Sequence, residues 1–142
     1  MATEKEERLR DDIKYYTEFI KENYDGKDID LLEIEKNIPE MKKLGVSHKA
    51  RSREGFINAF REAGSDLEKL PDDWKLRRLL FLARSIPQYF GKQHTRRRAL
   101  SLIAWAWMPN DKIPEHTRRL RRKQGIKKDV KKEKQEETKS QE

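Results

Sequence analysis

The sequence predicts an all-α protein, a compact bundle of five or six helices with a basic C-terminal extension and a disordered tail. Apolar residues recur at spacings of three and four through most of the chain, as they do on the buried side of a helix. Residues that begin or end helices stand between these runs. No segment combines the alternating pattern of a strand with a hairpin turn.

The composition favours a single small domain. The chain has 142 residues, of which 34% are hydrophobic and 42% are charged, so we expect a thin core with part of the chain outside it. There is no cysteine, which excludes disulfides and thiolate metal sites. The charged N-terminus lacks an apolar signal-peptide core, and no apolar run approaches the ~18–20 residues of a membrane span. We therefore expect a soluble, cytoplasmic protein with no membrane partner.

Capping residues predict the helices of the first third of the chain. Thr3 and Glu6 form a capping-box pattern, which predicts a helix that runs to about Tyr24. Asp30 is expected to cap a short second helix, which Pro39 ends or restarts.

The middle of the chain predicts two further short helical segments. Ser47 or Ser52 begins the first of them, and Gly64 ends it. Ser65 and Glu68 repeat the capping-box spacing and predict the start of the second.

Two longer helices are expected in the second half. One begins after Pro71 and reaches Ser85, before Pro87 breaks the chain. Thr95 caps the other, which extends to Met108. The expected core side of the first helix consists of Leu76, Leu79, Leu80 and Ala83.

The net charge of +8 is distributed unevenly. Residues 1–46 carry 9 Lys and Arg against 13 Asp and Glu, whereas residues 75–123 carry 14 Lys and Arg against two acids. A local excess of this size attracts polyanions, of which nucleic acid is the commonest candidate. The alternative is that Lys and Glu merely solvate helices. It explains residues 1–46 well and residues 75–123 poorly.

The helix after Pro71 interleaves arginines with aromatic residues on the side opposite its expected core. Trp74, Arg77, Arg78, Phe81 and Arg84 fall there when the helix is wound at about 100° per residue. Guanidinium groups beside large rings suit a polyanion that has bases to stack. The alternative is a second buried side, with the arginines extending to solvent at its edge.

The helix after Thr95 begins with Arg96, Arg97 and Arg98. Cations in a first turn oppose the helix dipole, so stability alone favours acidic residues there. Free N–H groups and three arginines together make a plausible phosphate site. Farther along, Trp105 points away from the expected core side. Either this helix is buried on two sides or Trp105 lies in an interface.

The basic segment near the C-terminus has little to bury. We expect it to order against a phosphate backbone, although a solvated extension or a localisation signal is the alternative. Its cations, together with Lys92, complete the predicted nucleic-acid-binding set, and they are Arg118, Arg119, Arg121, Arg122 and Lys123.

Nothing in the sequence predicts catalysis, a cofactor or a metal ion. The three histidines, His48, His94 and His116, lie far apart and have no metal-ligand spacing. There is no glycine-rich phosphate loop, nucleophile elbow or zinc-protease motif.

We therefore expect a non-enzymatic protein that binds the phosphate backbone of DNA or RNA, mainly independently of sequence. The alternative is a small helical interaction subunit of a ribonucleoprotein complex, such as those of CRISPR effectors, or of another protein assembly. No motif can be aligned with any of them. The expected organisation is a helical domain over 1–110, a short basic helix over 111–124 and a disordered Lys/Glu tail over 125–142.

Overall fold

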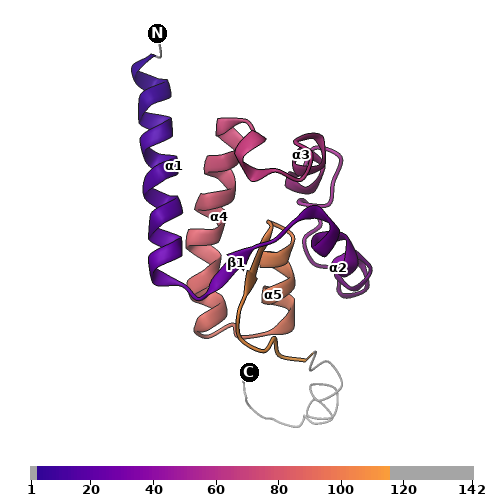
Figure 1. The fold of residues 1–142 in the computed structure, drawn as a ribbon. Helices are drawn as coiled ribbons and strands as arrows, with labels where there is room; N and C mark the ends of the chain where they lie inside the picture. The colour runs from indigo at the N-terminus through magenta and orange to yellow at the C-terminus, as the bar shows by residue number, and fades with distance from the viewer. Residues whose placement is uncertain (1–2, 116–142) are drawn as a thin grey trace.

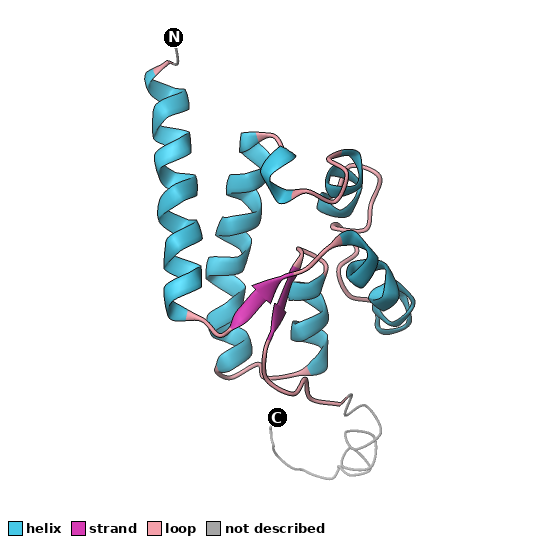
Figure 2. Cartoon of the chain, in the orientation of Figure 1, coloured by secondary structure: helices cyan, strands magenta, loops and turns pink. Residues whose placement is uncertain are grey.

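The computed structural model describes residues 3–115, which are mostly helical and include one small antiparallel sheet (Figures 1 and 2). None of the helices in this range is both long and apolar enough to cross a bilayer. Residues 110–115 are irregular, and the rest of the expected basic helix and tail lies outside the described residues. The elements are α1 (Glu4–Asn23), β1 (Gly26–Asp28), α2 (Leu31–Leu44), α3 (Phe56–Glu62), the 3₁₀ helix η1 (Leu67–Lys69), α4 (Asp72–Phe90), α5 (Arg96–Ile103) and β2 (Trp107–Pro109).

Three of the predicted helix starts are confirmed. Thr3 and Glu6 form a complete capping box at the start of α1, with each side chain accepting from the other residue's backbone N–H. The Asp30 carboxylate accepts a hydrogen bond of 2.9 Å from the N–H of Glu33 at the start of α2. Thr95 caps α5 through its hydroxyl, which accepts from a backbone N–H of the first turn. Each cap satisfies a donor that the helix leaves unpaired.

The prediction that prolines interrupt two helices was wrong. α2 continues through Pro39, and α4 continues through Pro87 as far as Phe90. A proline inside a helix costs about 3 kcal/mol. Both prolines are exposed, but each helix has fully buried residues before and after its proline, namely Ile34 and Met41 in α2 and Ile86 and Tyr89 in α4. This burial outweighs the local cost, so tertiary packing decides the length of both helices.

The third helix, α3, begins at Phe56, with Gly55 and not Ser47 or Ser52 in the N-cap position. Gly55 is required there because a Cβ atom on it would lie 2.0 Å from the carbonyl oxygen of Lys49. The preceding loop folds back closely enough for the N–H of Ile57 to donate to the Ala50 carbonyl. The sequence contains this glycine but offers no local sign of the close approach.

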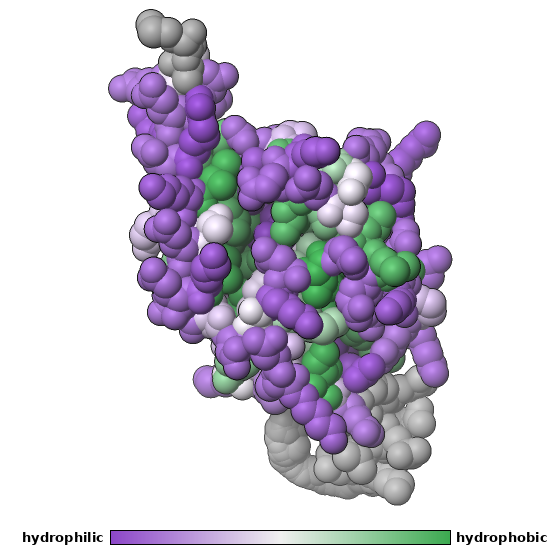
Figure 3. Space-filling model, viewed as in Figure 1, coloured by the Kyte–Doolittle hydropathy of each residue, from purple (hydrophilic) through white to green (hydrophobic). Residues whose placement is uncertain are grey.

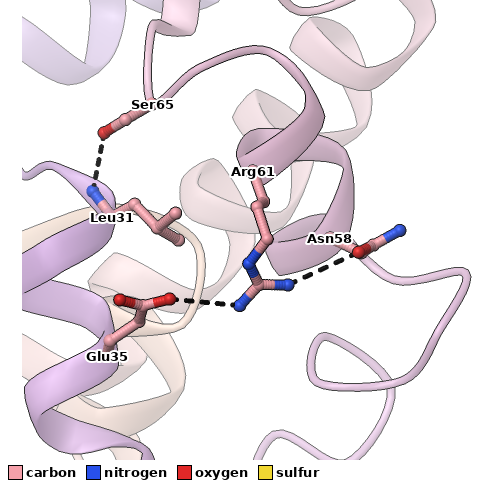
Figure 4. A network of polar contacts seen from close by, with 5 residues as sticks. All are labelled: Leu31, Glu35, Asn58, Arg61 and Ser65. Atoms are coloured by element: carbon pink, nitrogen blue, oxygen red, sulfur yellow. Dashed lines mark hydrogen bonds and ion pairs between the residues drawn. The ribbon is translucent and has the colours of Figure 1, made fainter.

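A polar network joins α2 to α3 and the turn that follows (Figure 4). The Arg61 guanidinium lies between Glu35 of α2, at 3.3 Å, and Asn58 of its own helix. Ser65, predicted to begin a capping box, instead accepts a 2.8 Å hydrogen bond from the N–H of Leu31 at the start of α2. Asp66 takes the capping position of η1.

The predicted helix from Thr95 to Met108 ends early, at Ile103, and the expectation of no strands was wrong. Trp107–Pro109 forms β2, which pairs antiparallel with β1 in the register Gly26↔Pro109 and Asp28↔Trp107. Position 26 requires glycine because the Trp107 ring fills the place of a side chain. The nearest ring atom lies 2.0 Å from where a Cβ on Gly26 would stand. The pairing is long-range, so no hairpin signal exists in the sequence to reveal it.

Two apolar clusters share α5 between them. One lies among α2, α3 and α5, and the other among α1, α4 and α5. Leu100 and Ile103 belong to the first cluster, while Ala99 and Leu102 belong to the second. The interpretation that this helix is buried on two sides is confirmed.

The predicted core side of α4 needs a correction. Leu79 is buried, but Leu80 is 40% exposed, and the buried side instead includes Arg78 and Leu82. The buried side differs from the prediction because α1 packs along the helix and the turn between α5 and β2 provides backbone acceptors for Arg78.

Candidate nucleic-acid interface

Two arginines on the exposed side of α4 lie over aromatic rings of the same helix. The guanidinium carbon of Arg77 is 4.0 Å from the centre of the Trp74 ring, and that of Arg84 is 5.8 Å from the centre of the Phe81 ring. Both arginines are exposed, and neither pairs with an acidic side chain within residues 3–115. Seven residues separate the two pairs, which places them on the same side of the helix about 10 Å apart.

The aromatic residues beneath these arginines pack on one another. The Trp105 ring centre lies 4.8 Å from that of Phe81, 5.0 Å from that of Phe56 and 6.2 Å from that of Trp74. Trp74, Phe81 and Trp105 are each half-buried. The rings thus belong to the core at one edge and reach the surface at the other.

Arg78 does not share the surface of Arg77 and Arg84. Its side chain is only 8% exposed and donates to the carbonyl oxygens of Trp105 and Ala106, at 2.7 and 2.9 Å. It also pairs with the Asp28 carboxylate at 2.8 Å. Burial lowers the pKa of Arg78, and Asp28 opposes that shift. This guanidinium holds β1 and the α5–β2 turn against α4.

The three arginines that begin α5 have partners within the fold. Arg96 makes a two-pronged contact with Glu40 of α2, including a 2.9 Å bond from Nη2 to Oε1, and this hydrogen bonding raises its pKa against the opposing effect of burial. Arg97 donates to the carbonyl oxygen of Leu44, where α2 ends. Arg98 donates to the side chain of Gln93. Arg97 and Arg98 therefore keep charges that no acidic side chain in residues 3–115 neutralises.

The remaining predicted cations fall in two groups. Lys92 is exposed in the turn directly after α4. The others lie outside the described residues, and they are Arg118, Arg119, Arg121, Arg122 and Lys123.

Sequence reasoning missed the acidic partners of Arg78 and Arg96. Asp28 lies 50 positions from Arg78, and Glu40 lies 56 positions from Arg96. No spacing rule links residues so far apart. The available signal was weaker, namely that Arg78 lies one turn before Leu82, on the side that the helix buries.

A second polar group lies at the other end of α4. The Tyr89 hydroxyl donates to one oxygen of Asp111 and His94 Nε2 contacts the other, both at 2.9 Å. Burial raises the pKa of Tyr89 above its ordinary value of 10, and the hydrogen bond and charge of Asp111 act in the same direction. Within the part of the chain that the structure describes, no three His, Asp or Glu residues are grouped to hold a metal ion.

The interface on α4 thus contains two exposed arginines over aromatic rings, with Lys92 beyond the helix end. Arg78 and Arg96 are engaged inside the fold. No family model, no curated protein and no solved structure matches the chain. Its function is therefore inferred from these residues.

Proposed function

We propose that the chain binds nucleic acid through the exposed side of α4, mainly without regard to base sequence. The observation that carries this proposal is the pair Arg77 and Arg84, two exposed guanidinium groups without acidic partners in residues 3–115, each lying over an aromatic ring. A guanidinium that is free of carboxylates can donate to phosphate oxygens. The ring holds it in place, which reduces the entropy lost on binding.

Phosphate contacts in this proposal extend beyond the two arginines. Lys92 lies past the end of α4, and Arg97 and Arg98 keep their charges at the start of α5. The five cations between positions 118 and 123 add to the same charge excess. Such contacts position a backbone but carry no base information, so the expected binding is sequence-independent. No catalytic step is part of the proposal.

The partially exposed edges of Trp74 and Phe81 favour a strand with accessible bases over a closed duplex. Bases stack on aromatic side chains only when they are free of their own neighbours. A single strand of DNA or RNA offers such bases. We therefore expect single strands to bind more tightly than duplexes of equal length.

The test is a fluorescence anisotropy titration with labelled single-stranded DNA and RNA of 20 nucleotides. Replacing Arg77 and Arg84 with Gln should lower the affinity about tenfold or more and reduce the salt slope by about 1.4. The matched control replaces Arg8 and Arg10, two exposed arginines of α1, and should lose much less. Equal losses in the two variants mean that net charge alone matters and that α4 has no site.

A second candidate function is that of a helical subunit in a larger protein assembly. The observation in its favour is a set of large apolar side chains left at the surface, Tyr15 at 60% and Leu32 at 63% exposure among them. A lone nucleic-acid binder is expected to bind unaided, whereas a subunit binds weakly until its complex forms. The same titration on the isolated chain separates the two functions.

A further inference from the structure

A cavity lies between α1 and α4, on a different side of α4 from the arginines of the proposed interface. Its volume is about 520 Å³, which falls within the range of small-molecule sites in proteins. Residues of β1, η1 and β2 complete its walls. Figure 3 shows the strip of apolar residues that runs beside α1 on this face of the molecule.

The deepest charged group on this cavity is Arg78. A guanidinium has five N–H donors, and the fold uses Nε and Nη2 for Trp105, Ala106 and Asp28. No acceptor within residues 3–115 takes a hydrogen bond from Nη1. In that range, Ser47 Oγ is the side-chain atom that is fully enclosed and has no hydrogen-bond partner. Nη1 of Arg78 also has no partner, so it is not fully enclosed. A nearly buried arginine therefore keeps one edge open to the cavity that it lines.

Lysines surround the same opening. Lys21, Lys27 and Lys75 line the cavity from three different elements. The two acidic residues of its wall do not cancel this charge. Asp28 is bonded to Arg78, and Lys75 is paired with Asp72 at 3.7 Å. Glu68 therefore stands against Lys21 and Lys27, which form no ion pair within residues 3–115. An anion entering here meets an excess of positive charge, at a site where the surrounding protein weakens screening by water.

The rest of the lining is apolar. Ile20, Leu79, Leu82 and Trp107 are each buried and contribute to the cavity wall. Such a surface favours a hydrocarbon or ring over a hydrated ion. The lining therefore favours a molecule with two parts, an acidic group that pairs with the cations and an apolar body that packs against the apolar side chains.

We propose that this cavity binds an amphipathic anion, a small molecule with an apolar body and one carboxylate or phosphate group. The acidic group pairs with Nη1 of Arg78 and with the lysines at the rim, and the body lies against Leu79, Leu82 and Trp107. This site is separate from the nucleic-acid interface, so either proposal can fail without the other.

The three tryptophans make the test specific. Trp107 lines the cavity, whereas Trp74 and Trp105 belong to the aromatic group under Arg77 and Arg84. The indole N–H signals of the ¹⁵N-labelled full chain are followed during titration with decanoate, decyl phosphate or decanol, each below its aggregation limit. Saturable movement of the Trp107 signal with either anion, at least about tenfold tighter than with decanol, supports the site. The two anions distinguish a carboxylate ligand from a phosphate ligand.

The matched variants leave Arg78 in place, because its bonds hold the fold together. Replacing Lys27 and Lys75 with Gln should weaken binding of the anions about three- to tenfold and leave decanol unchanged. Replacing Lys42 and Lys43, two exposed lysines of α2, is the control and should change neither. Equal binding of decanol, movement confined to Trp74 and Trp105, or no saturable change overturns the proposal.

Discussion

Arg96 and Glu40 are joined by two hydrogen bonds between one guanidinium and one carboxylate, across 56 positions of the chain. Each side chain is 30% exposed. The pair connects the first turn of α5 with α2. It also explains why an arginine stands where the helix dipole favours an acid, because the nearby carboxylate supplies the compensating negative charge.

Arg96→Gln should lower the free energy of unfolding by about 1–2 kcal/mol, because Glu40 loses a charge-assisted partner. The sequence alone predicts no such cost, since it treats the three arginines as surface charges that oppose the dipole. Urea denaturation of Arg96→Gln, Glu40→Gln and the double variant measures the coupling. Arg98→Gln is the control, with a cost below about 0.5 kcal/mol, since Arg98 bonds a neutral side chain. Additive single effects contradict the pairing.

Arg78→Met should be far more damaging than Arg77→Met, although the two residues are adjacent. Methionine keeps much of the volume at position 78 but leaves the Trp105 and Ala106 carbonyls without their donor. We expect a loss of about 3 kcal/mol or more at position 78 and less than about 0.5 kcal/mol at exposed position 77. Thermal and urea unfolding of both variants check this, and similar losses would place Arg78 at the surface.

Ser47→Gly should stabilise the protein, and Ser65→Gly should not. Both serines have left-handed backbone conformations, with φ of 61° and 63°, which glycine adopts more readily. The hydroxyl of Ser47 is buried without a partner in the described residues, whereas that of Ser65 accepts from Leu31. The expected gain at position 47 is about 1 kcal/mol. Thermal unfolding of the two variants and of the parent chain measures the shift of each midpoint. A greater gain in stability at position 65 than at position 47 contradicts the prediction.

Binding to single-stranded nucleic acid should weaken steeply as salt is raised. If ~4–8 phosphates are neutralised, the logarithmic slope against salt concentration is several units. Titrations at four salt concentrations measure this slope. Binding that is independent of salt, or no binding at low salt, would falsify the electrostatic basis of the proposed function.

Tyr89→Phe should change the alkaline stability of the protein. The folded-state pKa of Tyr89 is raised above 10, so its contribution is fully present below pH 10 and is lost as pH rises above that value. The phenylalanine variant lacks the bond to Asp111 and should lose about 1 kcal/mol at pH 7. It should also lose stability less steeply than the parent chain above pH 10. All other residues are the same in the two proteins, so their effect cancels in the comparison of the two pH profiles.

The starts of α1, α2 and α5 were predictable because capping is local. Thr3, Asp30 and Thr95 each bond to a backbone N–H three residues ahead, and that spacing is visible in the sequence. The helix ends at the prolines were not predictable in this way. Pro39 and Pro87 stay within helices because the helical residues before and after each proline pack against parts of the chain that are distant in sequence.

The candidate interface also has one part that could be predicted from the sequence and one part that could not. The pairing of Arg77 with Trp74 and of Arg84 with Phe81 follows from helical spacing, which a sequence contains. The contacts of Arg78 and Arg96 depend on acids that lie 50 and 56 positions away in the chain. A count of charges therefore exaggerates the cations that are free for a ligand, because it cannot tell a surface arginine from one that holds the fold together.

The sheet has a consequence for how the chain folds during synthesis. β1 and β2 are about 80 residues apart in the chain, and neither three-residue strand is stable without the other. The ribosome releases α1 and β1 first, but Trp107 reaches its place over Gly26 only after nearly the whole described chain has emerged. The apolar sides of α1 and β1 thus stay exposed to solvent until the segments that cover them are made. Closing the loop of about 80 residues between β1 and β2 costs entropy before any contact between them is gained. A nascent chain that stops before Trp107 leaves β1 without its partner strand, which makes synthesis through β2 the step that commits this protein to its fold.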